Sequence, residues 1–109
     1  MPERFETELA ALRERVDAID TQLLALLNAR AAVVRDIYAV KKEQGVPRFN
    51  QARTDAILQR LAADNQGPLT AQEVRALFTP LLEFFVKDYR GAEGEKAADG
   101  QARPTRPST

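Results

Sequence analysis

The fold is decided by residues 9–40, which read LAALRERVDAIDTQLLALLNARAAVVRDIYAV. From Arg4 to Gln44 the chain contains no proline and no glycine, and Ala, Leu, Arg and Glu dominate, so one continuous helix is predicted. Apolar residues recur along it at alternating steps of three and four, with one gap that Arg30 fills. The row consists of Leu9, Leu12, Val16, Ile19, Leu23, Leu26, Val33, Ile37 and Val40.

A second apolar row lies beside the first and makes the predicted buried face wider than the apolar stripe of a two-stranded coiled coil. It consists of Leu24, Leu27, Ala31 and Val34. A helix of about 40 residues is ~60 Å long, whereas a compact chain of about 100 residues has a radius of gyration of only ~13 Å. One chain cannot cover such a helix, so a two-fold homodimer is expected, with a long two-stranded coiled coil as the alternative.

The rest of the chain is predicted to form two shorter helices. After a loop that contains glycine and proline, Asn50 is placed to cap a helix over residues 51–63. Thr70 and Glu73 have the spacing of a capping box, so a third helix is expected from there to about Arg90. The apolar residues that it is expected to carry toward a core are Val74, Leu77, Phe78, Leu81, Leu82 and Phe85.

The predicted fold class is all-α, a three-helix subunit with a very long first helix in an intertwined homodimeric bundle. Pro80 is expected to kink the third helix, and Gly91 is placed to cap its C-terminal end. Residues 1–90 form the expected helical domain. Residues 91–109 contain no aliphatic side chain larger than alanine and no aromatic one, so we expect a disordered polar tail.

Composition excludes much of enzyme chemistry. The 109 residues include 16 basic and 16 acidic side chains, no histidine and no cysteine. Thiolate nucleophiles, histidine acid–base catalysis and the usual zinc ligand sets are therefore absent, and no metal or cofactor is expected. The net charge is zero, so the protein has no overall electrostatic attraction to nucleic acid or to an anionic membrane. With no basic, apolar leader and no membrane-length apolar run, a cytoplasmic location is predicted.

Four cationic residues are candidates for a local anion site. Arg30 stands where the apolar repeat calls for a hydrophobic side chain, and a buried guanidinium needs an anionic partner. Lys41 follows eleven positions later, about 16 Å along nearly the same side of the helix. Arg53 occupies the first turn of the second helix, and Arg13 points about 100° away from Arg30. The alternative for Arg30 is a pairing with an acid or a side chain that extends to the surface, and Lys41, Arg13 and Arg53, each taken alone, are more typical of a solvated face.

Residues 9–89 resemble the all-helical, AroQ-class chorismate mutases. The resemblance rests on the order and spacing of Leu12-Arg13, Ile19-Asp20, Leu23-Leu24-Ala25-Leu26-Leu27, Arg30, Lys41, Pro47, Arg53 and Leu58. It implies an intertwined dimer that rearranges chorismate to prephenate in the biosynthesis of phenylalanine and tyrosine, without a cofactor. The chain also resembles the mutase domain that some bacteria fuse to the first enzyme of the shikimate pathway, so another enzyme of that pathway is a possible partner.

The resemblance also implies roles for individual residues. Arg30 is expected to bind one carboxylate of the substrate, Arg13 of the other subunit the second, and Lys41 a carboxylate together with the ether oxygen. Arg53 is expected to border the ring hydroxyl. Cations on rigid helices are sufficient for this reaction, because a Claisen rearrangement requires only a folded substrate and positive charge near the ether oxygen.

Four positions depart from the family pattern. Asn50 stands in place of an aspartate, and Thr54 in place of a glutamate that contacts the substrate hydroxyl. Phe85 replaces a small residue, and Tyr89 replaces the glutamine or glutamate that faces the ether oxygen. We count all four as candidate substrate-site residues, with Tyr89 as a phenolic donor in catalysis beside Lys41 and Arg30. A shifted register of the third helix would bring in Glu83 instead.

Two other functions remain open at this point. An isochorismate-pyruvate lyase shares the fold and the cationic site with the mutases, and these residues do not separate the two. A non-catalytic dimer that binds a metabolite or a partner enzyme of the shikimate pathway is compatible with Thr54, Phe85 and Tyr89.

Overall fold

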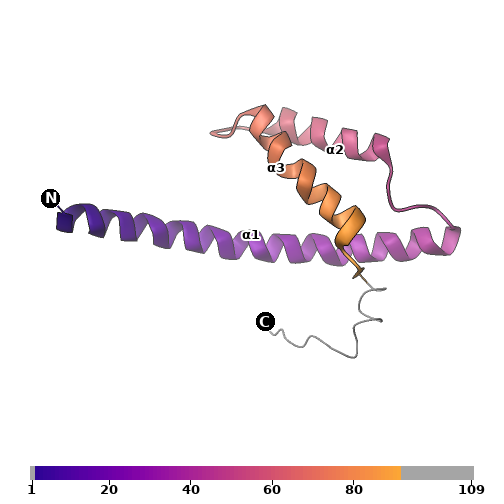
Figure 1. Cartoon of the computed structure of the whole chain (residues 1–109), viewed down its shortest axis with the longest axis horizontal. Helices are drawn as coiled ribbons and strands as arrows, with labels where there is room; N and C mark the ends of the chain where they lie inside the picture. Colours follow the sequence, from indigo (N-terminus) through magenta and orange to yellow (C-terminus); the bar gives the residue numbers. More distant parts are fainter. Residues whose placement is uncertain (1, 92–109) are drawn as a thin grey trace, which may run out of the picture. The chain divides into compact units, whose positions relative to one another are not determined.

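The structure, a computed structural model, describes residues 2–91. Helix α1 covers Pro2–Gln44, α2 covers Gln51–Asp64 and α3 covers Ala71–Glu83, followed by a short π-helical segment, η1, at Phe84–Asp88 (Figure 1). The described residues contain no strand, which confirms the all-α class with three helices. Residues 92–109 of the predicted tail lie outside the described part, so the predicted disorder is untested.

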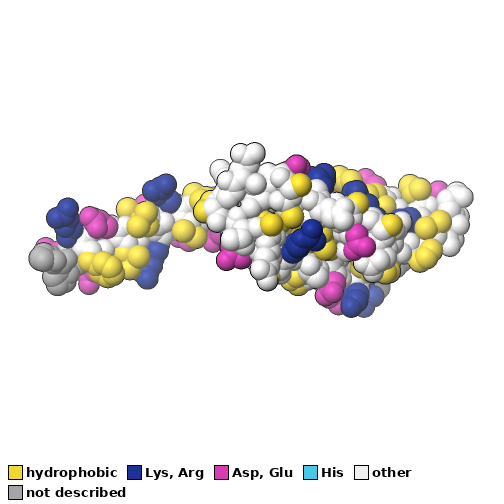
Figure 2. Space-filling view, turned by 90° about the horizontal axis from the view of Figure 1, so that it is seen from above, with side chains coloured by type: hydrophobic (Ala, Val, Ile, Leu, Met, Phe, Trp, Pro, Cys, Tyr) yellow, Lys and Arg dark blue, Asp and Glu magenta, His cyan; other side chains and the backbone are white. Residues whose placement is uncertain are grey.

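The chain separates into two compact units between Val33 and Val34. The described residues of the first unit all belong to α1. The apolar rows predicted from the sequence are largely exposed here, with Ile19 60%, Leu24 60% and Leu26 68% accessible. Figure 2 shows hydrophobic side chains along this part of α1 at the surface of the single chain. No helix within residues 2–91 is long and apolar enough to cross a membrane.

The C-terminal end of α1 is closed by a glycine motif. Gly45 has a φ of 69° and donates its backbone N–H to the carbonyl of Lys42, and Val46 donates to the carbonyl of Lys41. These two bonds form the Schellman pattern, in which a left-handed glycine satisfies the last carbonyls of a helix. The chain is thereby turned into the loop that leads to α2.

Two predicted helix starts are confirmed by their capping bonds. The side-chain oxygen of Asn50 accepts from the backbone N–H of Arg53 at 3.0 Å, and α2 begins at the next residue, Gln51. At the start of α3, the Thr70 hydroxyl accepts from the Glu73 backbone, and the Glu73 carboxylate accepts from the Thr70 backbone. Both ends are thus fixed by local side-chain bonds.

From Val34 onward, α2 and α3 pack against each other around a small apolar core (Figure 1). Its buried side chains are Val34, Ile57, Val74, Leu82 and Phe85. Leu77 was expected in this core but is 58% exposed, because it lies one step around α3 from the stripe that the buried residues form.

The end of the third helix differs from the prediction. The regular helix stops at Glu83, and the π turn that follows is closed by a bond from the Tyr89 N–H to the Phe84 carbonyl at 2.9 Å. Tyr89 is already extended, so the helix ends before Arg90, and Gly91, although its φ is 56°, is not its C-cap.

Candidate active site

Lys41 lies in the last turn of α1 and is half-buried. Its ammonium donates to the backbone carbonyl of Arg48 at 3.0 Å. An ammonium has three N–H donors, so Lys41 can still donate to an anionic ligand while this bond is kept. The bond therefore holds the ammonium close to the α1–α2 loop and restricts the motion of the Lys41 side chain.

Arg48 connects this loop to the end of η1. Its guanidinium lies over the ring of Tyr38, 4.2 Å from the ring centroid. Nη1 donates to the carbonyl of Tyr89 at 2.6 Å, and Nη2 donates to the carbonyl of Arg90 at 3.4 Å. Neither Arg48 nor Tyr38 was predicted from the sequence, where Arg48 is only a cation in the glycine–proline loop and Tyr38 an aromatic residue three positions before Lys41.

An aromatic cluster stands next to this connection. The Tyr38 hydroxyl donates to the Phe85 carbonyl at 2.9 Å. The rings of Phe85 and Tyr89 meet edge to face with centroids 5.2 Å apart, and Phe84 packs on Phe85 in the same way. Phe85 is only 5% exposed and Tyr89 is half-buried, so Phe85 serves the core and Tyr89 forms its edge.

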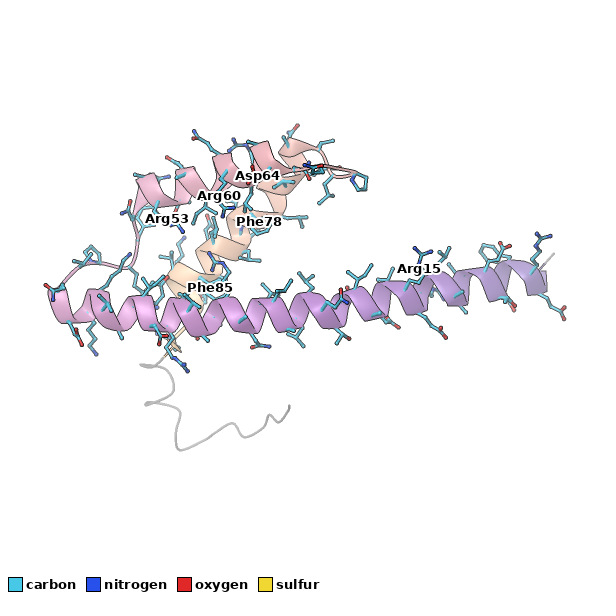
Figure 3. The ribbon with its side chains drawn as sticks, turned by 180° about the vertical axis from the view of Figure 1, so that it is seen from behind. Arg15, Arg53, Arg60, Asp64, Phe78 and Phe85 are labelled. Atoms are coloured by element: carbon cyan, nitrogen blue, oxygen red, sulfur yellow. The ribbon has the colours of Figure 1, made fainter. Side chains whose placement is uncertain are left out.

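Three further predicted residues lie at the start of α2. Asn50 and Arg53 are exposed, and Thr54 is half-buried. The oxygen of Asn50 is already bonded to the Arg53 backbone, so Asn50 fixes the helical turn from which the Arg53 side chain projects. Figure 3 shows Arg53 and Arg60 on the same side of α2, and Phe85 in η1, which follows α3.

A cavity of about 380 Å³ opens between α2 and the end of α3. Thr54 and Glu83 both line it, from opposite helices. The apolar part of its wall consists of Phe49, Leu58, Leu82 and Val86. Of the predicted site residues it contains Thr54, and Glu83 is the residue that a shifted register was expected to bring in. The other lining residues are polar, namely Gln51, Asp55, Thr79 and Lys87. A cavity of this size with both apolar and polar lining can hold a small molecule.

The remaining two candidates, Arg13 and Arg30, lie on the part of α1 before Val34. Arg13 is exposed, and Arg30 is half-buried with its Nη1 nitrogen shielded from solvent. Within residues 2–91 no group of three or more acidic side chains is arranged to hold a metal ion.

Comparison with known proteins identifies the family. Residues 12–88 match the sequence model of the family described as chorismate mutase type II. The structure of chorismate mutase form II from Thermus thermophilus superimposes with a TM-score of 0.73 at 28% identity, and the match covers 78% of this chain and 97% of that one.

Curated relatives are longer proteins. The bifunctional chorismate mutase/prephenate dehydratase of Pseudomonas aeruginosa is 34% identical over 82 residues, which are 71% of this chain and 22% of the relative. The 3-dehydroquinate dehydratase of Pyrobaculum aerophilum is 40% identical over 52 residues, 48% of this chain and 17% of that protein. The chain thus spans about a fifth of the curated relatives it matches. By its sequence match and its fold, the chain belongs to the type II chorismate mutase family.

Proposed function

We propose that this chain is a chorismate mutase that acts as a homodimer in the biosynthesis of phenylalanine and tyrosine. The observation that carries the proposal is the ammonium of Lys41, held in place by the Arg48 carbonyl in a chain whose residues 12–88 match the mutase family. Relatives that join a mutase to prephenate dehydratase support the same pathway. The cytoplasmic location stays a prediction.

The reaction is an intramolecular rearrangement of a dicarboxylate. The ether C–O bond of chorismate breaks while a C–C bond forms in the same molecule, so no proton, electron or atom is exchanged with the protein. Negative charge grows on the ether oxygen as the C–O bond stretches, and a fixed cation beside it stabilises the transition state more than the ground state. Holding the substrate in its folded conformation lowers the entropic part of the barrier.

The roles proposed for the residues are those that the resemblance to the AroQ-class chorismate mutases implies. Arg30 and the Arg13 of the other subunit bind the two carboxylates, and Lys41 binds a carboxylate together with the ether oxygen. Guanidinium groups suit carboxylates because their paired N–H donors match both oxygens. Tyr89 donates its phenolic hydrogen towards the ether oxygen.

Polar and aromatic residues complete the proposed site. Arg53, on the turn that Asn50 caps, borders the ring hydroxyl. Thr54, which lines the α2–α3 cavity, replaces a carboxylate at this position and can still bond a hydroxyl. Phe85 supports Tyr89 through the edge-to-face contact of their rings.

The exposed apolar row of α1 supports the homodimer. Each Leu, Ile or Val side chain that a second subunit fully covers contributes about 1.5–3 kcal/mol. Ile19→Glu is therefore expected to convert the dimer into monomer or unfolded chain, because the carboxylate would be buried without a partner. Sedimentation velocity at fixed protein concentration measures the change.

Ala25→Glu is the matched control for that substitution. Ala25 is exposed and lies about 120° around α1 from Ile19, away from the apolar row, so the same new charge remains in solvent. The control variant is expected to stay dimeric. A monomeric wild type, or a dimer that survives Ile19→Glu, would contradict the proposed assembly.

Parallel incubation with chorismate and with isochorismate tests the assignment of the reaction. The proposal predicts saturable formation of prephenate from chorismate, and at most slow release of pyruvate from isochorismate. Product analysis by NMR separates the two reactions. Faster pyruvate release would identify a lyase instead, and binding of chorismate without conversion would identify a non-catalytic binding domain.

A further inference from the structure

Arg48 touches both candidate catalytic residues of this part of the chain, through different atoms. Its backbone carbonyl accepts the hydrogen bond from the Lys41 ammonium at 3.0 Å. Its guanidinium donates to the carbonyl of Tyr89 at 2.6 Å and to that of Arg90 at 3.4 Å. The positions of Lys41 and Tyr89 are therefore set from one residue in the α1–α2 loop.

The backbone carbonyls at the C-terminal end of η1 need hydrogen-bond donors from outside the helix. Carbonyls at the C-terminal end of a helix have no N–H groups within the helix to bond, and they concentrate the negative end of its dipole. Two of the carbonyls at this end are met from outside the helix, that of Phe85 by the Tyr38 hydroxyl and that of Tyr89 by the guanidinium. A cation at this end is favoured electrostatically as well as by its hydrogen bonds.

The guanidinium is also held by an aromatic face. It lies 4.2 Å from the centroid of the Tyr38 ring, within the range of a cation–π contact. A planar guanidinium can stack on a ring with its face and donate to two carbonyls with its edge, whereas an ammonium is a single point charge. Arg48 is half-buried, so solvent competes less for these bonds than it does at the surface.

We infer that Arg48 is a positioning residue of the active site: its side chain sets the place of Tyr89 relative to Lys41 while making no contact with the substrate. The inference rests on the proposed function, because it assigns Arg48 to the catalysis that Lys41 and Tyr89 perform. Tyr38 acts with Arg48, since it supports the guanidinium with its ring and the Phe85 carbonyl with its hydroxyl.

Arg48→Ala tests this role without removing the carbonyl that Lys41 uses. Misplacement of a reacting group by about 1 Å costs up to about 100-fold in rate, so we expect kcat to fall about 10- to 100-fold. KM should change little, because the carboxylate-binding cations remain. Arg48→Lys should recover part of the loss. Arg75→Ala, an exposed arginine on α3, is the control and should match the wild type.

A spectroscopic signal follows the same change without substrate. The chain has two tyrosines, Tyr38 and Tyr89, and no tryptophan, so its near-ultraviolet tyrosine circular dichroism reports on this cluster. Arg48→Ala should alter that signal while the far-ultraviolet spectrum and the sedimentation coefficient stay the same. Arg75→Ala should leave all three unchanged.

A double-mutant cycle separates positioning from general stabilisation. If Arg48 acts through Tyr89, then Arg48→Ala combined with Tyr89→Phe should lose little more activity than the more damaging single variant. Losses that multiply in full, or an Arg48→Ala variant with wild-type kcat, overturn the inference. A wild type that forms no prephenate overturns the proposed function instead, so the two failures are distinguishable.

Discussion

Lys41→Ala is expected to lower kcat/KM for chorismate about 100- to 1,000-fold, the effect of removing one fixed donor from a developing oxyanion. The substitution deletes the ammonium that the Arg48 carbonyl holds, and it leaves the backbone carbonyl that accepts from Val46 at the end of α1. Folding should therefore be retained. Stopped-flow or steady-state loss of the chorismate diene absorbance measures the effect.

Lys42→Ala is the matched control, because Lys42 is the next residue of α1 and is exposed. It lies about 100° further round the helix and should keep activity within about twofold of the wild type. Equal losses in the two variants, or a Lys41→Ala variant with wild-type turnover, would contradict the assignment of Lys41 to the ether oxygen.

Mixing two inactive variants is expected to restore activity. If each site takes Lys41 from one subunit and Arg13 from the other, then Arg13→Ala and Lys41→Ala damage different partners of the same site. A heterodimer of the two variants contains one intact site and one doubly damaged site. Random reassortment at equal concentrations should give about a quarter of the wild-type activity, since half of the dimers then carry one working site out of two.

The control mixture uses two variants whose substituted residues, Arg30 and Lys41, are proposed to come from the same subunit in each site. Arg30→Ala and Lys41→Ala damage separate sites in a heterodimer, so neither site is repaired and the mixture should remain inactive. Activity is assayed after the subunits are exchanged in mild denaturant and refolded. Recovery in the control mixture, or none with Arg13→Ala, would contradict the shared site.

The starts of the helices were predictable because local chemistry decides them. Asn50 caps α2, and Thr70 and Glu73 form the capping box of α3, within four residues of chain. The closure of α1 at Gly45 follows equally from local backbone geometry. Signals of this kind need no knowledge of the remainder of the fold.

The end of α3 was not predictable in the same way. Its π turn, closed from Tyr89 to Phe84, is accompanied by bonds from Tyr38 and Arg48, more than forty residues earlier in the chain. No periodicity in residues 84–91 encodes those partners. The exposure of Leu77 has a similar origin, since which side of α3 is covered depends on where α2 packs.

The sequence predicts which residues belong to the candidate site better than it predicts how they are arranged in space. The apolar repeat singles out Arg30, and the spacing of Lys41 follows from the same helix. The α2–α3 cavity, in contrast, is lined by Thr54 and Glu83 from different helices, and the side chain of the loop residue Arg48 bonds to the carbonyl of Tyr89, which is distant in sequence. Such pairings are properties of the folded chain.

The most direct test is to incubate the purified protein with chorismate and to identify the product by NMR, with Lys41→Ala measured alongside. We expect stoichiometric conversion to prephenate at a rate that saturates with substrate, and a loss of turnover of about 100-fold or more in the variant. Chorismate that remains unchanged in the presence of the folded wild-type protein, or equal turnover by the variant, would contradict the proposed function.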